Sequence, residues 1–160
     1  SYDAGISYIR NVFEATRTLQ KNPDDLDARG IIMMGASLST SSRLGIGKEE
    51  PFAYEIYELE FLPEKLFGSS YRRSLTSVFP RFLQAMGKHH ADDIRKYYHD
   101  SFGIDSSIEE SSRKLVELFE GLGVEMYYDG KITREQVDAI PCHTELSKEE
   151  VFDIINSLIR

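Results

Sequence analysis

Apolar residues recur at three- and four-residue steps in one segment of this chain after another. Such steps gather side chains on one face of a helix, whereas a half-buried strand needs strict alternation. The pattern covers residues 4–21, 71–86, 91–102 and 108–122. Only residues 124–128 look extended, and a single strand has no partner in this sequence. The sequence therefore predicts an all-α fold, a bundle of seven to eight helices around one core.

Three residue pairs mark helix starts by the capping-box pattern, in which Ser or Thr is followed three residues later by Glu or Gln. The pairs are Ser106 with Glu109, Thr133 with Gln136, and Ser147 with Glu150. The last two are flanked by apolar pairs that suit a hydrophobic staple, Ile132 with Val137 and Leu146 with Val151. We therefore expect two short helices to close the chain.

Proline and glycine divide the middle of the chain. Pro63 is expected to end the third helix, and Pro80 must kink the fourth or begin its second half, because proline lacks the N–H that a helix interior uses. Gly123 is placed as a helix stop. Residues 27–45 are small or apolar nearly all the way round and include Gly30 and Gly35. This composition predicts a buried helix whose neighbours approach its backbone closely.

Length and charge limit the class of protein. A chain of 160 residues with 41% hydrophobic composition can bury one core, so we expect residues 1–160 to form a single domain. Its net charge of -8 repels phosphate backbones and anionic lipid surfaces, which argues against nucleic acid and membrane as partners. Cys142 is the only cysteine, so a reducing compartment is expected and the cytoplasm is the default location. No apolar run approaches the roughly 20 residues that span a bilayer.

The densest mixture of carboxylates, tyrosines and arginines lies at residues 43–80. Glu55 and Glu58, one helical turn apart, could serve acid–base chemistry or half of a di-metal site, but the Glu-x-x-His motifs of such a site are missing. A solvated acidic face is the simpler interpretation. Tyr71 begins an apolar helical face, which favours a core tyrosine whose hydroxyl finds a partner.

The histidines and the cysteine suggest further sites. His89 and His90 with Asp92 and Asp93 could supply metal donors, yet adjacent residues point in different directions on a helix, so a solvated helix start is favoured. Cys142 with the following histidine lacks a third group to orient a nucleophile, and a structural loop is favoured there. The glycines at 45 and 47 indicate a turn, since no strand precedes them as a dinucleotide-binding motif requires.

From about residue 5 to 158 the order and spacing of short motifs resemble the C-terminal helical domain of the iron-containing alcohol dehydrogenases, in the branch of NAD(P)H-dependent butanol dehydrogenases and aldehyde reductases. The matching motifs are Asn22-Pro23, Asp27-Ala28-Arg29, Met33-Met34, Gly45-Ile46-Gly47, Phe52-Ala53, Phe79-Pro80, Leu122-Gly123, Asp129-Gly130 and Leu146-Ser147.

This resemblance implies a divalent metal, commonly iron or zinc, between the helical domain and an N-terminal nucleotide-binding domain that holds NAD(P). Two family ligands, an Asp-x-x-x-His pair, would precede Ser1. The other two, both histidines in the family, fall on Glu55 and Tyr71, and a nearby family histidine falls on Leu59. Glutamate and tyrosinate can bind a hard metal, so the alternatives are an oxygen-rich metal site and a site that has lost its metal.

The sequence therefore predicts the C-terminal domain of a longer NAD(P)-dependent oxidoreductase that interconverts alcohols and aldehydes, inactive alone and with altered metal-ligand positions. Its implied partners are the nucleotide-binding domain of the same parent chain, a small alcohol or aldehyde, and a second copy in a homodimer. The alternative is a non-catalytic helical domain of the same fold that serves assembly or binds a ligand.

Overall fold

The computed structural model describes residues 2–40 and 54–160, and it is all-helical as predicted. The described residues form eight helices. They are α1 (Tyr2–Lys21), α2 (Leu26–Thr40), α3 (Tyr54–Phe67), α4 (Tyr71–Met86), α5 (Ala91–Phe102), α6 (Ile108–Gly121), α7 (Arg134–Asp138) and α8 (Lys148–Asn156). No helix among these residues is long and apolar enough to cross a membrane.

The chain divides into two compact units, each described by itself. The first holds α1, α2 and the segment Tyr97–Gly103 at the end of α5; the second holds Tyr54–Lys96 and Ile104–Arg160. The expectation of one domain over residues 1–160 stays a prediction. The predicted turn at Gly45 and the motif at Phe52 lie outside the described residues.

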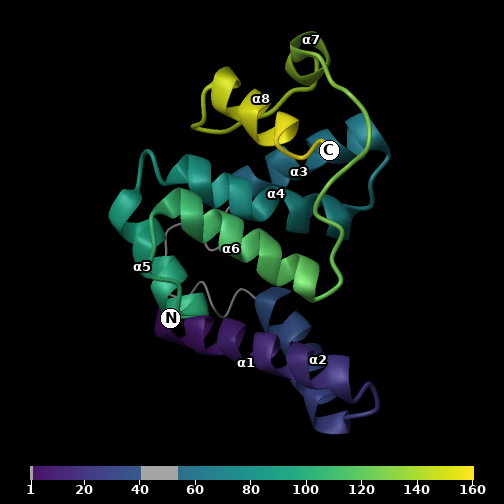
Figure 1. The fold of residues 1–160 in the computed structure, drawn as a ribbon, viewed down its shortest axis with the longest axis vertical. Coiled ribbons are helices and arrows are strands. Elements are labelled where there is room, and N and C mark those ends of the chain that lie inside the picture. The colour runs from purple at the N-terminus through teal and green to yellow at the C-terminus, as the bar shows by residue number, and fades with distance from the viewer. Residues whose placement is uncertain (1, 41–53) are drawn as a thin grey trace. The chain divides into compact units, whose positions relative to one another are not determined.

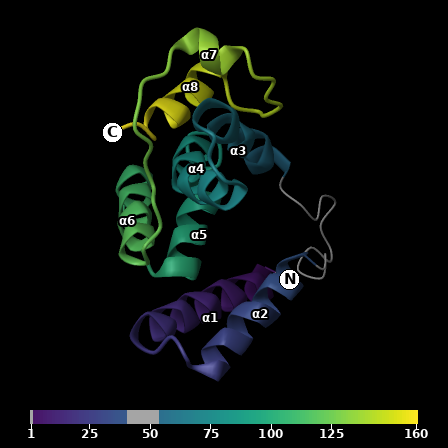
Figure 2. The ribbon, with the colours of Figure 1, turned by 90° about the vertical axis from the view of Figure 1, so that its right-hand side faces the viewer.

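In the first unit, α1 and α2 pack side by side (Figure 2) and are joined by a short turn. Asp25 caps α2, since its carboxylate accepts a hydrogen bond from the N–H of Ala28 at 2.9 Å. Gly35 lets the two helices meet, because a Cβ there would lie 1.9 Å from the hydroxyl oxygen of Tyr8. The end of α5 joins this unit through Phe102, whose ring lies 5.2 Å from that of Phe13.

The prediction that the second helix is buried is wrong. Among residues 26–39 of α2, whose burial is described, only Ala28 and Gly35 are buried. Four of its large apolar side chains are exposed: Leu26, Ile31, Met33 and Met34. Composition indicated burial, but α2 packs against α1 through its small residues, so the large side chains are left on the outside.

In the second unit, α4 packs against α3, α6 and α8. Figure 1 shows α4 and α6 side by side, and in Figure 2 α4 lies between α3 and α6. Core residues of α3, α4 and α8 form one apolar cluster with α7 and the connecting segments. All four residues of the two predicted staples, Ile132, Val137, Leu146 and Val151, lie in or against this cluster.

The capping boxes of α7 and α8 are confirmed: the Thr133 and Ser147 side chains accept from the N–H groups of Gln136 and Glu150, and both return bonds are present. The capping box expected at Ser106 is wrong by one residue, since Ser107 caps α6 and accepts from the N–H of Glu110. The confirmed pairs lie where tertiary packing and local sequence favour the same start residue.

Two predictions, one about the end of α3 and one about the extended segment 124–128, need correction. Pro63 lies inside α3 and does not end it, because its ring is buried in the core and the helix continues to Phe67. Residues 124–128 form no strand, but they do have a partner: Tyr128 makes a parallel bridge with Ile159 near the C-terminus. Pro80 lies within α4, which continues through it to Met86, and Gly123 follows the end of α6 with φ +85° as expected of a stop.

Candidate functional site

The turn between α3 and α4 sets the position of Tyr71. Gly68 has φ +63°, a conformation that favours glycine, and it lets the chain reverse between the two helices. Tyr128 fixes this turn, because its hydroxyl lies 2.8 Å from Ser69 Oγ and 3.1 Å from Ser77 Oγ. Its ring also stacks on that of Phe67 at 4.6 Å. Tyr71 therefore begins α4 at a defined place beside α3.

Glu60 is a buried titratable group of the helix that precedes this turn. It lies on α3, is 1% exposed, and its Oε2 atom has no hydrogen-bond partner. Burial raises the pKa of Glu60 to about 7, and the charge of Glu64 one turn later adds to this increase. The carboxyl group is therefore about half protonated near neutral pH, and it can either donate or accept a proton.

Tyr71 lies with this carboxyl group and not with Glu55. Its side chain shares a hydrogen bond with Tyr57, and its pKa is raised by burial first and then by Tyr57, Glu60 and Glu64. We call Tyr57, Glu60, Glu64 and Tyr71 the α3–α4 cluster. The expectation of a core tyrosine at position 71 is wrong, because the residue is 49% exposed, but its hydroxyl does find a partner.

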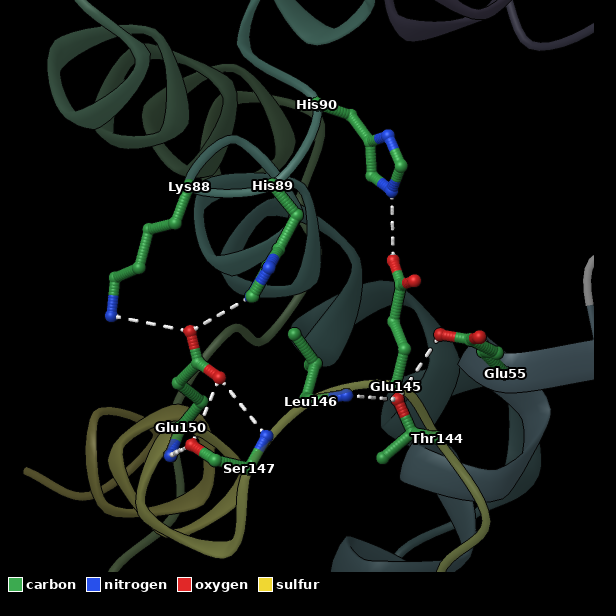
Figure 3. A network of polar contacts seen from close by, with 9 residues as sticks. All are labelled: Glu55, Lys88, His89, His90, Thr144, Glu145, Leu146, Ser147 and Glu150. Carbon is green, nitrogen blue, oxygen red and sulfur yellow. Dashed lines mark hydrogen bonds and ion pairs between the residues drawn. The ribbon is translucent and has the colours of Figure 1, made fainter.

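The carboxylates of Glu55 and Glu58 accept hydrogen bonds from the loop that precedes α8. Thr144 Oγ1 donates to Glu55 Oε2 at 3.1 Å, and the N–H of His143 donates to Glu58 Oε2 at 3.2 Å. Figure 3 shows Thr144 between Glu55 and the N–H of Leu146. Both glutamates are half-buried, so the interpretation of a solvated acidic face missed their role. Sequence gave no signal for it, because the loop lies more than 80 residues further along the chain.

The two family ligand positions therefore have separate partners in the described structure. Leu59, the position of the nearby family histidine, is fully buried in the apolar core. Among the residues that the structure describes, no group of three or more His, Cys, Asp and Glu could hold a metal ion. A metal held by Glu55 and Tyr71 stays a prediction.

The adjacent histidines lie in the turn between α4 and α5, where His89 contacts the first turn of α8 and His90 contacts the segment before it. His89 Nε2 lies 3.2 Å from Glu150 Oε1, and His90 Nε2 lies 3.0 Å from Glu145 Oε1 (Figure 3). Lys88 Nζ also reaches Glu150 Oε1, at 3.6 Å. The exposure expected of these histidines is confirmed. Their carboxylate partners could not be foreseen from sequence.

Cys142 lies in the loop that Glu55 and Glu58 hold, and it packs against the core. Burial raises the pKa of its thiol to about 11, and the charges of Glu58 and Glu55 add to the increase. A thiol with this pKa stays protonated at neutral pH and is a poor nucleophile. The contacts agree with the interpretation of a structural loop.

Sequence reasoning did not single out a second polar region, built around Tyr127. The guanidinium carbons of Arg81 and Arg160 lie 4.9 Å and 3.6 Å from the centre of this ring. The three residues line a cavity of about 610 Å³ together with side chains of α6. Arg73 pairs with Glu125 at 3.1 Å and also donates to the carbonyl oxygen of Tyr127.

No protein-family model, curated protein or solved structure matches this chain. The resemblance to iron-containing alcohol dehydrogenases therefore rests on the sequence motifs alone.

Proposed function

We propose that this chain is the helical domain of an NAD(P)-dependent oxidoreductase that interconverts alcohols and aldehydes in the cytoplasm. On this proposal it resembles the C-terminal domain of the iron-containing alcohol dehydrogenases and works with a nucleotide-binding domain that holds NAD(P). The observation that carries the proposal is the α3–α4 cluster. It puts a buried carboxyl group with a pKa of about 7 beside Tyr71, one of the family's ligand positions.

Aldehyde reduction needs a hydride and a proton: the aldehyde, NAD(P)H and one proton give the alcohol and NAD(P)⁺. A group that donates a hydrogen bond to the carbonyl oxygen, and then its proton, can serve as the acid. Tyr71 is exposed enough to meet a substrate, and Glu60 can return a proton to the cluster. Tyr71 is proposed as the hydrogen-bond donor to the substrate oxygen and Glu60 as the source of the proton.

The described residues fit a metal poorly. A ligating tyrosine must lose its proton, and the raised pKa of Tyr71 opposes that loss. The Glu55 carboxylate already accepts a hydrogen bond from the hydroxyl group of Thr144. We therefore assign no step of the reaction to a metal, and we propose that proton donation by the α3–α4 cluster replaces metal polarisation of the oxygen.

A fusion protein tests this function. The full chain would be joined to the nucleotide-binding domain of an iron-containing alcohol dehydrogenase, and oxidation of NADPH by a short-chain aldehyde would be followed by absorbance. We expect turnover from the fusion, none from the chain alone, and no loss on treatment with a chelator. Tyr71→Phe should lower turnover by roughly a hundredfold or more, as expected for the loss of a general acid. Tyr2→Phe is the control, because Tyr2 is exposed and lies on α1 in the other unit.

A folded fusion that binds NADPH but turns over no aldehyde would contradict the proposal. Loss of turnover on treatment with the chelator would show that the reaction uses a metal. The titration of Glu60 supplies an independent check, since the ¹³C signal of its carboxyl carbon should move with a midpoint near pH 7. A midpoint near 4.5 would remove Glu60 as the proton source.

Exposed apolar side chains on α2 favour a second candidate, a non-catalytic domain that assembles with itself. Leu26, Met33 and Met34 are 80%, 72% and 62% exposed. Large apolar side chains gathered on one helix often mark an interface. Sedimentation analysis would show a dimer that Met34→Lys disrupts, with Lys21→Met as a control at the exposed end of α1. A monomer at all concentrations would argue against this candidate.

A further inference from the structure

Three aromatic side chains are exposed on the second unit, at the α3–α4 cluster. Tyr57 and Phe61 lie four residues apart on α3, a spacing that puts both on one face of the helix. Tyr71, at the start of α4, shares a hydrogen bond with Tyr57. The exposed fractions of Tyr57, Phe61 and Tyr71 are 37%, 48% and 49%. We call these three residues the aromatic rim. Large apolar side chains that are exposed together often mark a binding surface.

Negative charge lies beside and beneath this rim. Glu64 follows Phe61 by three residues on the same face of α3, and it is half-buried. Glu60 is 1% exposed, and among the described residues its Oε2 atom has no hydrogen-bond partner. Both carboxylates lie close enough to Tyr71 for their charges to raise the pKa of its hydroxyl group. A buried carboxylate oxygen without a partner is costly, so a positive charge that binds above it would be stabilised.

No cation among the described residues neutralises the two carboxylates. Lys65 and Arg72 are near them in sequence, but both are exposed, and neither makes an ion pair with Glu60 or Glu64 in the part of the chain that the structure describes. Burial and the charge of Glu64 together raise the pKa of Glu60, as expected where no positive charge opposes them. The cluster therefore keeps an unmatched negative charge at an aromatic surface.

We propose that the aromatic rim binds a small molecule that carries a methylated ammonium group, with the cation beside Glu64 and its methyl groups on the rings of the rim. The faces of aromatic rings attract such a cation through their quadrupole. A metal ion would need several oxygen ligands to replace its water shell, and among the described residues no group of three or more His, Cys, Asp and Glu could hold one. The proposal uses the same cluster as the reaction proposed above but does not rest on that reaction.

Four soluble probes test the proposal on the full chain. Tetramethylammonium has the charge and the methyl groups, tert-butanol has a similar shape without the charge, ammonium has the charge without the methyl groups, and phosphocholine adds a phosphate to the same cation. Binding would be followed by NMR at constant ionic strength through the ring signals of the aromatic rim. We expect saturable shifts with tetramethylammonium, and roughly tenfold weaker binding of tert-butanol and ammonium. Phosphocholine should also bind more weakly, because the carboxylates repel its phosphate.

Two variants remove the two kinds of contact. Phe61→Leu keeps an exposed apolar side chain but removes a ring, and Glu64→Gln removes the charge. Each should weaken the binding of tetramethylammonium roughly two- to fivefold. Glu109→Gln is the matched control, because it removes an equal charge from an exposed position on α6 and should leave binding unchanged. Circular dichroism checks that each variant folds.

Tyr71→Phe separates this proposal from the proposed reaction. The variant keeps the ring, so tetramethylammonium should bind it almost as well as the wild type, whereas turnover by the fusion protein should fall. Bound tetramethylammonium should also lower the midpoint of the Glu60 carboxyl titration, because a nearby positive charge favours the ionised form. Binding is measured without NADPH or aldehyde, so a failure of the reaction leaves this test intact.

Equal binding of tert-butanol and tetramethylammonium, or no saturable shift at the aromatic rim with any probe, overturns the proposal. Phosphocholine binding tighter than tetramethylammonium overturns the assignment to a small cation and favours a lipid headgroup. Unchanged binding in a folded Phe61→Leu or Glu64→Gln variant overturns the place assigned to the ring or to the charge.

Discussion

Glu150 carries the strongest electrostatic link between α8 and the turn that follows α4. Its carboxylate accepts hydrogen bonds from the N–H and the hydroxyl group of Ser147, both at 2.9 Å, and lies near Lys88 and His89 (Figure 3). These hydrogen bonds from Ser147, and then those of His89, hold the pKa of Glu150 at about 2, against an ordinary value of 4.5. Glu150→Gln keeps the shape of the capping box and removes the charge.

The stability that the charge of Glu150 contributes follows from the shift of its pKa. Because the folded protein holds the proton less tightly than the unfolded chain, the charge of Glu150 stabilises the fold above about pH 4.5, and this stabilisation is lost as pH falls towards 2. The difference in pKa corresponds to at most about 3 kcal/mol. A glutamine side chain can still accept the hydrogen bonds from Ser147, which are the largest causes of the shift, so we expect Glu150→Gln to cost about 1–2 kcal/mol at pH 7.

Urea unfolding of both proteins at several pH values is the assay. The difference in free energy of unfolding should be largest above about pH 5 and should shrink as pH falls towards 2, where about half of the wild-type carboxylate is protonated. Glu149→Gln is the matched control, since Glu149 shares the first turn of α8 but is itself 65% exposed and pairs with Arg134. It should cost only a few tenths of a kcal/mol. Equal losses in the two variants, or a difference for Glu150→Gln that does not vary with pH, would refute the reasoning.

Three further substitutions have expected outcomes. Gly35→Ala should lower the thermal midpoint by several degrees, because the new methyl group would overlap the hydroxyl of Tyr8, and Gly30→Ala, where the space is open, is its control. Glu60→Gln should raise the free energy of unfolding above pH 7 by up to about 3 kcal/mol: burial favours the neutral carboxyl, so the wild type loses stability as pH rises from about 4.5 to 7. The wild type and this variant should converge in urea unfolding below about pH 4.5. Tyr128→Phe should cost about 1–2 kcal/mol in the same assay, since the hydroxyl bonds two serine side chains.

The features that the sequence predicted well are local ones. The capping boxes of α7 and α8 depend on residues three positions apart, and each was found where the pattern indicated. Pro63 shows the limit of local rules, because burial of its ring in the core compensates for the helix bond that proline removes. α2 shows another limit: its composition indicated a buried helix, but the neighbour that it packs against covers only its small residues.

The polar contacts could not be predicted, because they join residues far apart in the chain. Thr144 and Glu55 are 89 positions apart, and His89 and Glu150 are 61 apart. A single sequence states which residues are charged, but only the packing of α3, α4 and α8 brings these pairs together. The same holds for the α3–α4 cluster, where Glu60 acquires its raised pKa from burial that no periodicity distinguishes from exposure.

Tyr127 and Tyr128 lie between the turn that precedes Tyr71 and the polar region around Arg81. Neighbouring side chains of an extended segment point to opposite sides. Accordingly, Tyr128 fixes the turn that positions Tyr71, whereas Tyr127 lines the cavity of Arg81. The segment itself is held by the C-terminus, since the N–H of Tyr128 donates to the carbonyl oxygen of Leu158 at 2.8 Å and the N–H of Arg160 donates back to Tyr128 at 3.1 Å. These two hydrogen bonds hold the backbone of Tyr128 in place, so the C-terminus also helps to position the turn before Tyr71.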